Sequence, residues 1–207
     1  MPLLTSNEEP ITQYRVIWDF MNTVDRKKTV ITHDAGSPRD QITPFYESLV
    51  PHGYMGWGKT TQLGMGMGLM HGAKLANPDW NCFNFMGDAA IGMVGMDFET
   101  AVRNKIGTTT VVFRNHVMGG YTEYHAEASK KYGIHKLGGD YVAMAKAFGG
   151  YAERVEKPAD IISAIKRCIE QNDQGMPALL EIITTEERRF AKNLPDLDKV
   201  RQSAESV

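Results

Sequence analysis

An aspartate and an asparagine stand 27 positions apart in this sequence, each close behind an apolar run. Asp88 follows residues 82–86 and Gly87, and Asn115 follows the β-branched run 108–113. A hard cation such as Mg²⁺ prefers oxygen ligands, commonly a carboxylate together with phosphate oxygens. Asp88 offers a carboxylate oxygen and Asn115 an amide oxygen. The helix and strand expected between them form one crossover that returns the chain to the same sheet edge. The pair therefore predicts a magnesium site that also holds a phosphate.

Small residues accompany this aspartate and recur in an earlier loop. Gly87 lets the backbone pass close to a phosphate, and the helix expected after it offers N–H groups. Gly36 and Ser37 likewise follow a β-branched run, residues 29–32. We expect three such loops at one edge of a single sheet: residues 33–37, 87–90 and 115–120.

Strands and helices alternate along the chain. Short β-rich runs predict strands at residues 29–32, 82–86, 108–113 and 178–183. Helical spacing of apolar residues predicts helices at residues 11–24, 93–102, 141–148 and 159–171. The last helix is expected to have one apolar stripe of Ile161, Ile162, Ile165, Cys168 and Ile169. This order predicts a doubly wound, mostly parallel sheet with helices on both faces, a three-layer α/β/α fold. Such sheets bind ligands beyond the carboxyl ends of their strands.

The composition is that of an ordinary globular protein. Of the 207 residues, 42% are hydrophobic and 23% charged, and the net charge is −2. This balance gives no electrostatic reason to expect nucleic acid or an anionic membrane as a partner. Cys82 and Cys168 lie in apolar runs without metal-ligand spacing, so we expect buried free thiols and a cytoplasmic location. Residues 1–10 are expected to be a leader or linker, residues 11–185 one domain, and residues 186–207 a charged tail.

A second phosphate-binding motif competes with the first. The segment from Gly53 to Thr60 matches the P-loop pattern G-x-x-x-x-G-K-[ST]. A P-loop needs a strand directly before its first glycine, but Pro51 stands there. It also needs a long helix behind it, and the glycines at 64, 66 and 68 make a poor helix start. A P-loop nucleotide-binding protein remains the alternative prediction.

The first set of motifs resembles the thiamine-diphosphate (ThDP) enzymes, most closely the acetolactate synthase-like 2-oxo acid decarboxylases and carboligases. Their signature is Gly-Asp-Gly/Ala, about 25 residues, then Asn. The loop from His33 to Ser37 resembles the family's first diphosphate loop, and residues 63–78 resemble its glycine-rich helix start. The resemblance covers most of residues 5–185. It implies that residues 11–185 are the domain that binds the diphosphate of ThDP with Mg²⁺.

The resemblance also assigns roles to single positions. It implies metal ligation by Asp88, Asn115 and the backbone carbonyl of Val117, and an apolar wedge at Leu63 between the two ThDP rings. The implied cofactor contacts are Gly36, Ser37, Thr61, Gln62, Leu63, Gly87, Asp88, Ala89, Ala90, Asn115, Val117, Met118, Gly119 and Gly120. The substrate side is expected at Tyr121, Tyr124 and His125. The chain departs from the family at Ala89 for glycine, at Ala90 for a frequent serine, and at Pro38, which has no N–H to donate.

One catalytic element of the family has no counterpart here. The glutamate that activates ThDP belongs to a separate pyrimidine-binding domain, and no glutamate of this chain has a similar context. We therefore expect no catalytic residue in this chain, and an active site completed by a partner domain or subunit. We also expect a homo- or hetero-oligomer, with an exposed apolar surface around Leu63, Met65, Met67 and Met70. A ThDP-binding scaffold without turnover is a further alternative.

Overall fold

A computed structural model describes residues 2–56, 58 and 62–187 of the chain. Six parallel strands form one sheet: β1 Thr29–His33, β2 Tyr54–Met55, β3 Asn81–Gly87, β4 Thr109–Arg114, β5 Tyr151–Val155 and β6 Ala178–Ile183. Their order across the sheet is β2-β1-β3-β4-β6-β5. The helices are α1 Gln13–Thr23, α2 Ser37–Ile42, α3 Met65–Ala76, α4 Asp88–Val94, α5 Asp97–Arg103, α6 Tyr121–Tyr124, α7 Ala126–Tyr132, α8 Tyr141–Ala147 and α9 Ile161–Asp173.

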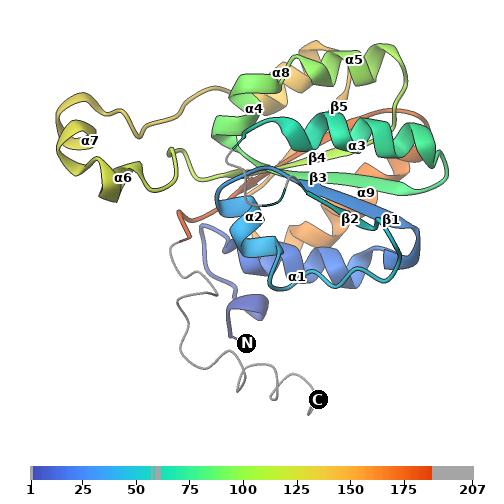
Figure 1. Ribbon diagram of the computed structural model, residues 1–207, viewed down its shortest axis with the longest axis horizontal. Coiled ribbons are helices and arrows are strands. Elements are labelled where there is room, and N and C mark those ends of the chain that lie inside the picture. The colour runs from blue at the N-terminus through green and yellow to red at the C-terminus, as the bar shows by residue number, and fades with distance from the viewer. Residues whose placement is uncertain (1, 57, 59–61, 188–207) are drawn as a thin grey trace.

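Helices cover both faces of the sheet, which confirms the three-layer prediction. In Figure 1, α3, α4, α5 and α8 lie on one face, and α1, α2 and α9 lie on the other. Each strand divides its side chains between two apolar cores because successive residues point to opposite faces. In β3, Phe83 and Phe85 enter the core beneath α1 and α9, whereas Cys82 and Met86 enter the core beneath α3.

The strands and long helices lie where the sequence predicts them, with ends shifted by a few residues. Five short elements escaped prediction: β2, β5, α2, α6 and α7. The proposed stripe on α9 needs correction at Ile162, which is 40% exposed. Ile161, Ile165 and Cys168 are buried as expected, because these positions recur at helical spacing on one face of the helix. Ile162 lies about 100° around the helix from Ile161, at the edge of this face.

The glycine-rich segment forms helix α3, Met65–Ala76, although the low helix propensity of its glycines argues against a helix there. A Cβ on Gly66 of α3 would stand 2.1 Å from Oδ1 of Asn84 and 2.9 Å from the carbonyl oxygen of His33. The helix can approach β1 and β3 this closely only without a side chain at that position. Burial against the sheet therefore overrides the low helix propensity of glycine.

Residues 53–60 match the P-loop pattern, but the described residues among them lie in a different order of strand and helix from that of a P-loop. Strand β2 follows Gly53 instead of preceding it, and pairs with β1. Lys59, Thr60 and Thr61 lie outside the described residues. The next helix starts only at Met65. A P-loop requires strand, loop and helix in that sequence, so the structure does not support the nucleotide-binding alternative.

Both cysteines are free and buried, as the sequence predicts. Burial raises the pKa of the Cys82 thiol to about 11 and also raises the pKa of Cys168. Within the described parts of the chain, none of the helices is long and apolar enough to cross a bilayer.

Candidate functional site

A cavity of about 230 Å³ opens at the carboxyl edge of the sheet. The chain passes from β1 outward to β2 and then returns to β3 on the other side of β1. The strand order thus reverses between β1 and β3, and ligands of open α/β sheets bind at such a switch point. The loops after β1, β3 and β4 all line this cavity, as the alternation of strands and helices predicts.

Asp88 is held from two sides in this cavity. It is the first residue of α4 and only 3% exposed. Its Oδ1 accepts a hydrogen bond from the N–H of Ala89 at 3.0 Å, and its Oδ2 accepts one from the N–H of His116 at 2.8 Å. Burial raises the pKa of this carboxyl group, and the two N–H donors partly oppose the rise. A second lone pair on each oxygen stays available for a cation.

The segment after β4 is fixed by backbone pairing. Oδ1 of Asn115 accepts a hydrogen bond from the N–H of Val117 at 3.1 Å. The N–H of Met118 donates to the carbonyl of His135 at 2.7 Å, and the N–H of Leu137 donates to the carbonyl of His116 at 2.9 Å. These contacts set the direction of the peptide groups that border the cavity.

A buried ion network lies behind these residues, and the sequence did not reveal it. Glu181 of β6 is fully buried and accepts hydrogen bonds from both Arg114 and Arg154. The Arg114 guanidinium also lies over the ring of Tyr141, 5.3 Å from its centroid. The hydroxyl of Tyr141 in turn donates to the backbone carbonyl of Asp88 at 3.0 Å. The network connects β4, β5, β6 and α8 to the start of α4.

The first loop is tied to the glycine-rich helix. Asp34 is 1% exposed, and its Oδ1 accepts a hydrogen bond from the N–H of Gly66 at 3.0 Å. Burial raises the pKa of Asp34. Gly64 caps α3 with φ 91°, and a Cβ there would stand 2.2 Å from the side chain of Val94. These contacts place Leu63 at the wall of the cavity.

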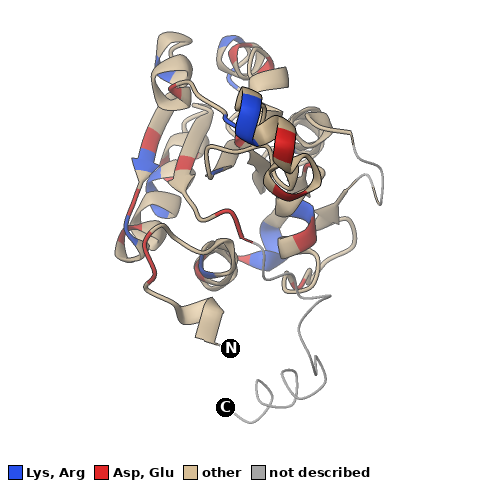
Figure 2. Ribbon diagram, turned by 90° about the vertical axis from the view of Figure 1, so that its left-hand side faces the viewer, with Lys and Arg blue, Asp and Glu red and all other residues tan. Residues whose placement is uncertain are grey.

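Glu186 and Glu187 also line the cavity, although the sequence assigns them to the charged tail. Oε2 of Glu187 accepts a hydrogen bond from the hydroxyl of Thr12 at 2.9 Å. Oε1 of Glu186 accepts hydrogen bonds from the N–H of Gly120 at 3.4 Å and the hydroxyl of Thr122 at 3.1 Å. Figure 2 looks onto this edge and shows acidic residues in the segment that follows β6. No feature of the local sequence marks this pair as cavity residues.

The charged side chains among the described residues that line the cavity are all acidic. Asp40 and Asp88 line it together with the two glutamates, and no lysine or arginine is among the described lining residues. A polyanionic ligand therefore needs N–H donors and a cation to bind here. The described residues contain no cluster of three or more His, Cys, Asp or Glu side chains suited to a metal. A metal held by Asp88 thus needs the amide, carbonyl and phosphate oxygens.

The structure brings most of the predicted site residues to this cavity. Its wall includes Gly36, Ser37, Leu63, residues 87–90, Asn115 and residues 117–120. Gln62 is exposed and outside this lining, and Thr61 lies outside the described residues. Of the three substrate-side candidates, only Tyr124 lines the cavity. The ring of Tyr121 instead packs edge-to-face against His125, with 4.9 Å between centroids.

The expected apolar surface around α3 needs correction. Met67 and Met70 are fully buried in the core beneath the helix. They recur at helical spacing on the face of α3 that packs on β1 and β3. Among the described methionines, those that are exposed are Met93 and Met96, with exposed fractions of 60% and 67%.

Known proteins are similar to this chain in sequence and in fold. The family model "Thiamine pyrophosphate enzyme, C-terminal TPP binding domain" matches residues 34–182; thiamine pyrophosphate is another name for ThDP. A probable acetolactate synthase large subunit of Methanocaldococcus jannaschii is 26% identical over 192 residues, which cover 88% of this chain and 32% of that protein. A probable acetolactate synthase of Mycobacterium bovis is 28% identical over 184 residues, covering 87% of this chain and 33% of that protein.

A solved structure has the same fold. The ThDP-dependent 4-hydroxybenzoylformate decarboxylase of Rhodococcus jostii superposes with a TM-score of 0.76 at 18% identity, over 87% of this chain and 34% of that one. The chain spans about a third of the length of the curated relatives named above. Its strand order, its switch-point cavity and the family match over residues 34–182 agree, and the chain belongs to the family of C-terminal TPP-binding domains of thiamine pyrophosphate enzymes.

Proposed function

We propose that the cavity binds the diphosphate of ThDP together with Mg²⁺. Asp88 and Asn115 supply side-chain oxygens to the metal, and Val117 supplies its backbone carbonyl. Gly36, Ser37 and the N-terminus of α4 lie beside the phosphates, and Leu63 lies against the cofactor rings. An oxygen donor set of this kind suits Mg²⁺, which keeps several ligands from phosphate and water.

The observation that carries this proposal is the convergence of three loops on one acidic cavity at the switch point. Asp88 and Asn115 come from neighbouring strands, β3 and β4, and reach the same wall. Since the wall carries carboxylates and no described lysine or arginine, a diphosphate enters only with a cation that offsets its charge. The chemistry of the wall thus matches a metal–diphosphate and disfavours a free anion.

We further propose that the chain is part of a ThDP-dependent lyase or carboligase of the acetolactate synthase-like type. Bound ThDP supplies an electron sink for making or breaking a C–C bond next to a carbonyl. The residues of this chain hold and orient the cofactor. A separate pyrimidine-binding domain or subunit supplies the activating glutamate and completes a homo- or hetero-oligomer. The matched relatives are about three times as long as this chain, which leaves room for such a domain.

A cytoplasmic location belongs to the same proposal. Both cysteines are free, buried thiols, and free thiols suit a reducing compartment.

Titration calorimetry of the 207-residue chain tests the cofactor assignment. ThDP should bind in the presence of Mg²⁺ and much more weakly in the presence of a chelator. Absence of ThDP binding at millimolar concentrations with Mg²⁺ would overturn the proposal. ATP with Mg²⁺ serves as the comparison: ATP binding that is lost in Lys59→Ala would support a nucleotide-binding protein instead.

A further inference from the structure

The side chain of Gln13 is buried at the cavity without a hydrogen-bond partner. Gln13 is the first residue of α1, and its exposed fraction is 0%. It lines the same cavity as Asp88 and Gly36. Neither Nε2 nor Oε1 has a partner among the described residues. No motif in the sequence marks this glutamine as a site residue.

An unpaired buried amide is costly and calls for an explanation. A buried donor or acceptor without a partner loses its hydrogen bonds to water and gains none in return. Such groups are rare in native proteins, and a missing ion, water or ligand commonly accounts for them. The position of Gln13 in the cavity wall points to a ligand that enters this cavity.

The surroundings of Gln13 select the chemistry of that ligand. Thr12, the N-cap residue of α1 directly before Gln13, donates a hydrogen bond to Glu187, which also lines the cavity. Other donors expected at this wall are absent: Pro38 has no N–H, and Ala90 has no side-chain hydroxyl. The NH₂ group of Gln13 therefore offers two uncharged donors in an acidic cavity. A phosphate oxygen is an acceptor that suits them.

The position of α1 indicates which phosphate is involved. Helices α1 and α3 cover opposite faces of the sheet (Figure 1), and Leu63 directly precedes the start of α3. Gln13 and Leu63 thus reach the cavity from opposite faces. A ligand whose rings contact Leu63 presents its far end to Gln13. For ThDP the far end is the terminal phosphate.

We propose that the side-chain amide of Gln13 donates a hydrogen bond to the terminal phosphate of the bound diphosphate. This inference rests on the ThDP-binding function proposed above. Gln13 acts in binding, and it takes no part in the chemistry at the cofactor rings.

The test compares Gln13→Met with the unchanged chain in calorimetric titrations of ThDP with Mg²⁺. Methionine has a similar volume and no N–H donor. A hydrogen bond to a charged group corresponds to about a 10- to 100-fold change in affinity, so the dissociation constant should rise by that factor. A change of less than two-fold would overturn the inference. If the unchanged chain itself fails to bind ThDP, the proposed function fails and not merely this contact.

Gln41 provides a matched control. It too is fully buried with both amide atoms unpaired, but it does not line the cavity. Gln41→Met should leave the dissociation constant unchanged. An equal weakening in both variants would show a general packing effect and would overturn the assignment.

Two further readouts separate a ligand contact from a structural role. In the absence of ThDP, Gln13→Met should unfold at the same or a higher temperature, because an unpaired buried amide is removed. A lower unfolding temperature with unchanged affinity would show a purely structural role. At saturation, the ³¹P NMR signal of the terminal phosphate should differ between the variant and the unchanged chain, and the signal of the inner phosphate should not. A shift of only the inner phosphate signal would contradict the assignment to the terminal phosphate. If Gln13→Met does not fold, Gln13→Glu carries the affinity test, with a larger loss expected because a carboxylate faces the phosphate.

Discussion

The backbone N–H of His116 donates a hydrogen bond to Oδ2 of Asp88 at 2.8 Å, across 28 positions of sequence. This contact joins the loop after β4 to the start of α4. His116 has a φ of 62°, a left-handed conformation that few non-glycine residues adopt. The loop is thereby held in a shape that presents Asn115 and Val117 beside Asp88.

Replacing Asp88 should remove metal-dependent binding. We expect Asp88→Ala to abolish the Mg²⁺-dependent affinity for ThDP in calorimetry, because the carboxylate ligand is lost. Circular dichroism should show an unchanged fold. Asp97→Ala is the matched control, since Asp97 also begins a helix, α5, but is exposed and outside the cavity. Retained affinity in Asp88→Ala would contradict the metal assignment.

Gly66 and Gly68 should respond in opposite directions to alanine. Gly66→Ala places a Cβ 2.1 Å from Oδ1 of Asn84 and should destabilise the chain by about 1–3 kcal/mol. Gly68 is exposed in the same helix, and its Cβ would meet nothing within 4 Å. Gly68→Ala should therefore stabilise the chain by roughly 0.5–1 kcal/mol. Urea unfolding measures both, and equal effects would contradict the close approach of α3 to the sheet.

His71 should make the stability depend on pH. It is 8% exposed, and burial lowers its pKa below the ordinary 6.5, while Asp97 acts weakly in the opposite sense. Below pH 6.5 the unfolded chain takes up the proton first, so stability falls as pH falls toward the depressed pKa of the folded state. Replacing His71 by Gln should reduce this loss between pH 7.5 and 5.5 in urea unfolding. An unchanged pH dependence in His71→Gln would contradict this role of His71.

The isolated chain should bind the cofactor without activating it. The activating glutamate is proposed to belong to a partner domain, and general acid–base assistance of this kind contributes about 10²–10⁴-fold. We therefore expect no measurable 2-oxo acid decarboxylation with saturating ThDP and Mg²⁺. Hydrogen–deuterium exchange at C2 of ThDP, followed by NMR, should be as slow as for the free cofactor and should accelerate when the partner domain is added. Fast exchange by the chain alone would show that a catalytic base lies within it. If the partner domain does not accelerate exchange, the chain is better explained as a ThDP-binding scaffold without turnover.

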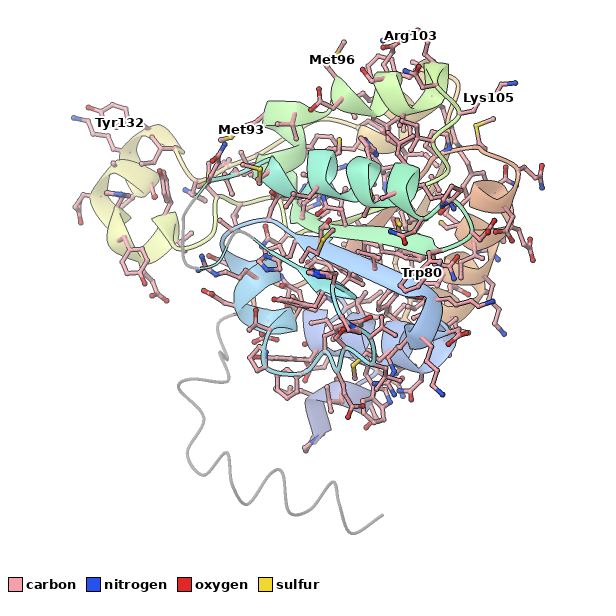
Figure 3. All side chains as sticks on the ribbon, turned by 45° about the vertical axis from the view of Figure 1, so that its right-hand side comes forward. Trp80, Met93, Met96, Arg103, Lys105 and Tyr132 are labelled. Carbon is pink, nitrogen blue, oxygen red and sulfur yellow. The ribbon has the colours of Figure 1, made fainter. Side chains whose placement is uncertain are left out.

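Association should depend on exposed methionines outside α3. Met93 and Met96 project from the region of α4 and α5 (Figure 3). Tyr132 lies at the end of α7, in the segment of α6 and α7 that projects from the rest of the molecule (Figure 3). These side chains are 60%, 67% and 68% exposed, and exposed apolar groups of this kind favour association. We expect a dimer or larger species in sedimentation velocity, reduced in Met93→Lys combined with Met96→Lys. Ile162→Lys is the control on the opposite face of the sheet. A monomer at high micromolar concentration would contradict this expectation.

Local sequence patterns predict four of the six strands, β1, β3, β4 and β6, and the spacing of the key polar residues. β-branched and apolar runs such as β4 and β6 depend on local preference and on burial of both strand faces, which a linear pattern reveals. The interval between Asp88 and Asn115 follows from one crossover between neighbouring strands, so their meeting could be predicted as well. The early loop with Gly36 was found by the same reasoning.

Packing between distant segments determines which other residues share the cavity. Gln13 and Glu187 are far apart in sequence and have no motif; they meet because Ile11 pairs with Thr184 at the end of β6 and brings the start of α1 to the carboxyl edge. The burial of Met67 likewise depends on which face of α3 packs on the sheet. The low helix propensity of glycine argues against a helix at α3, yet the helix forms because it packs on the sheet. Local patterns fix what each segment forms, but the walls of a cavity arise from packing between segments, whose energy depends on contacts that no single stretch of sequence contains.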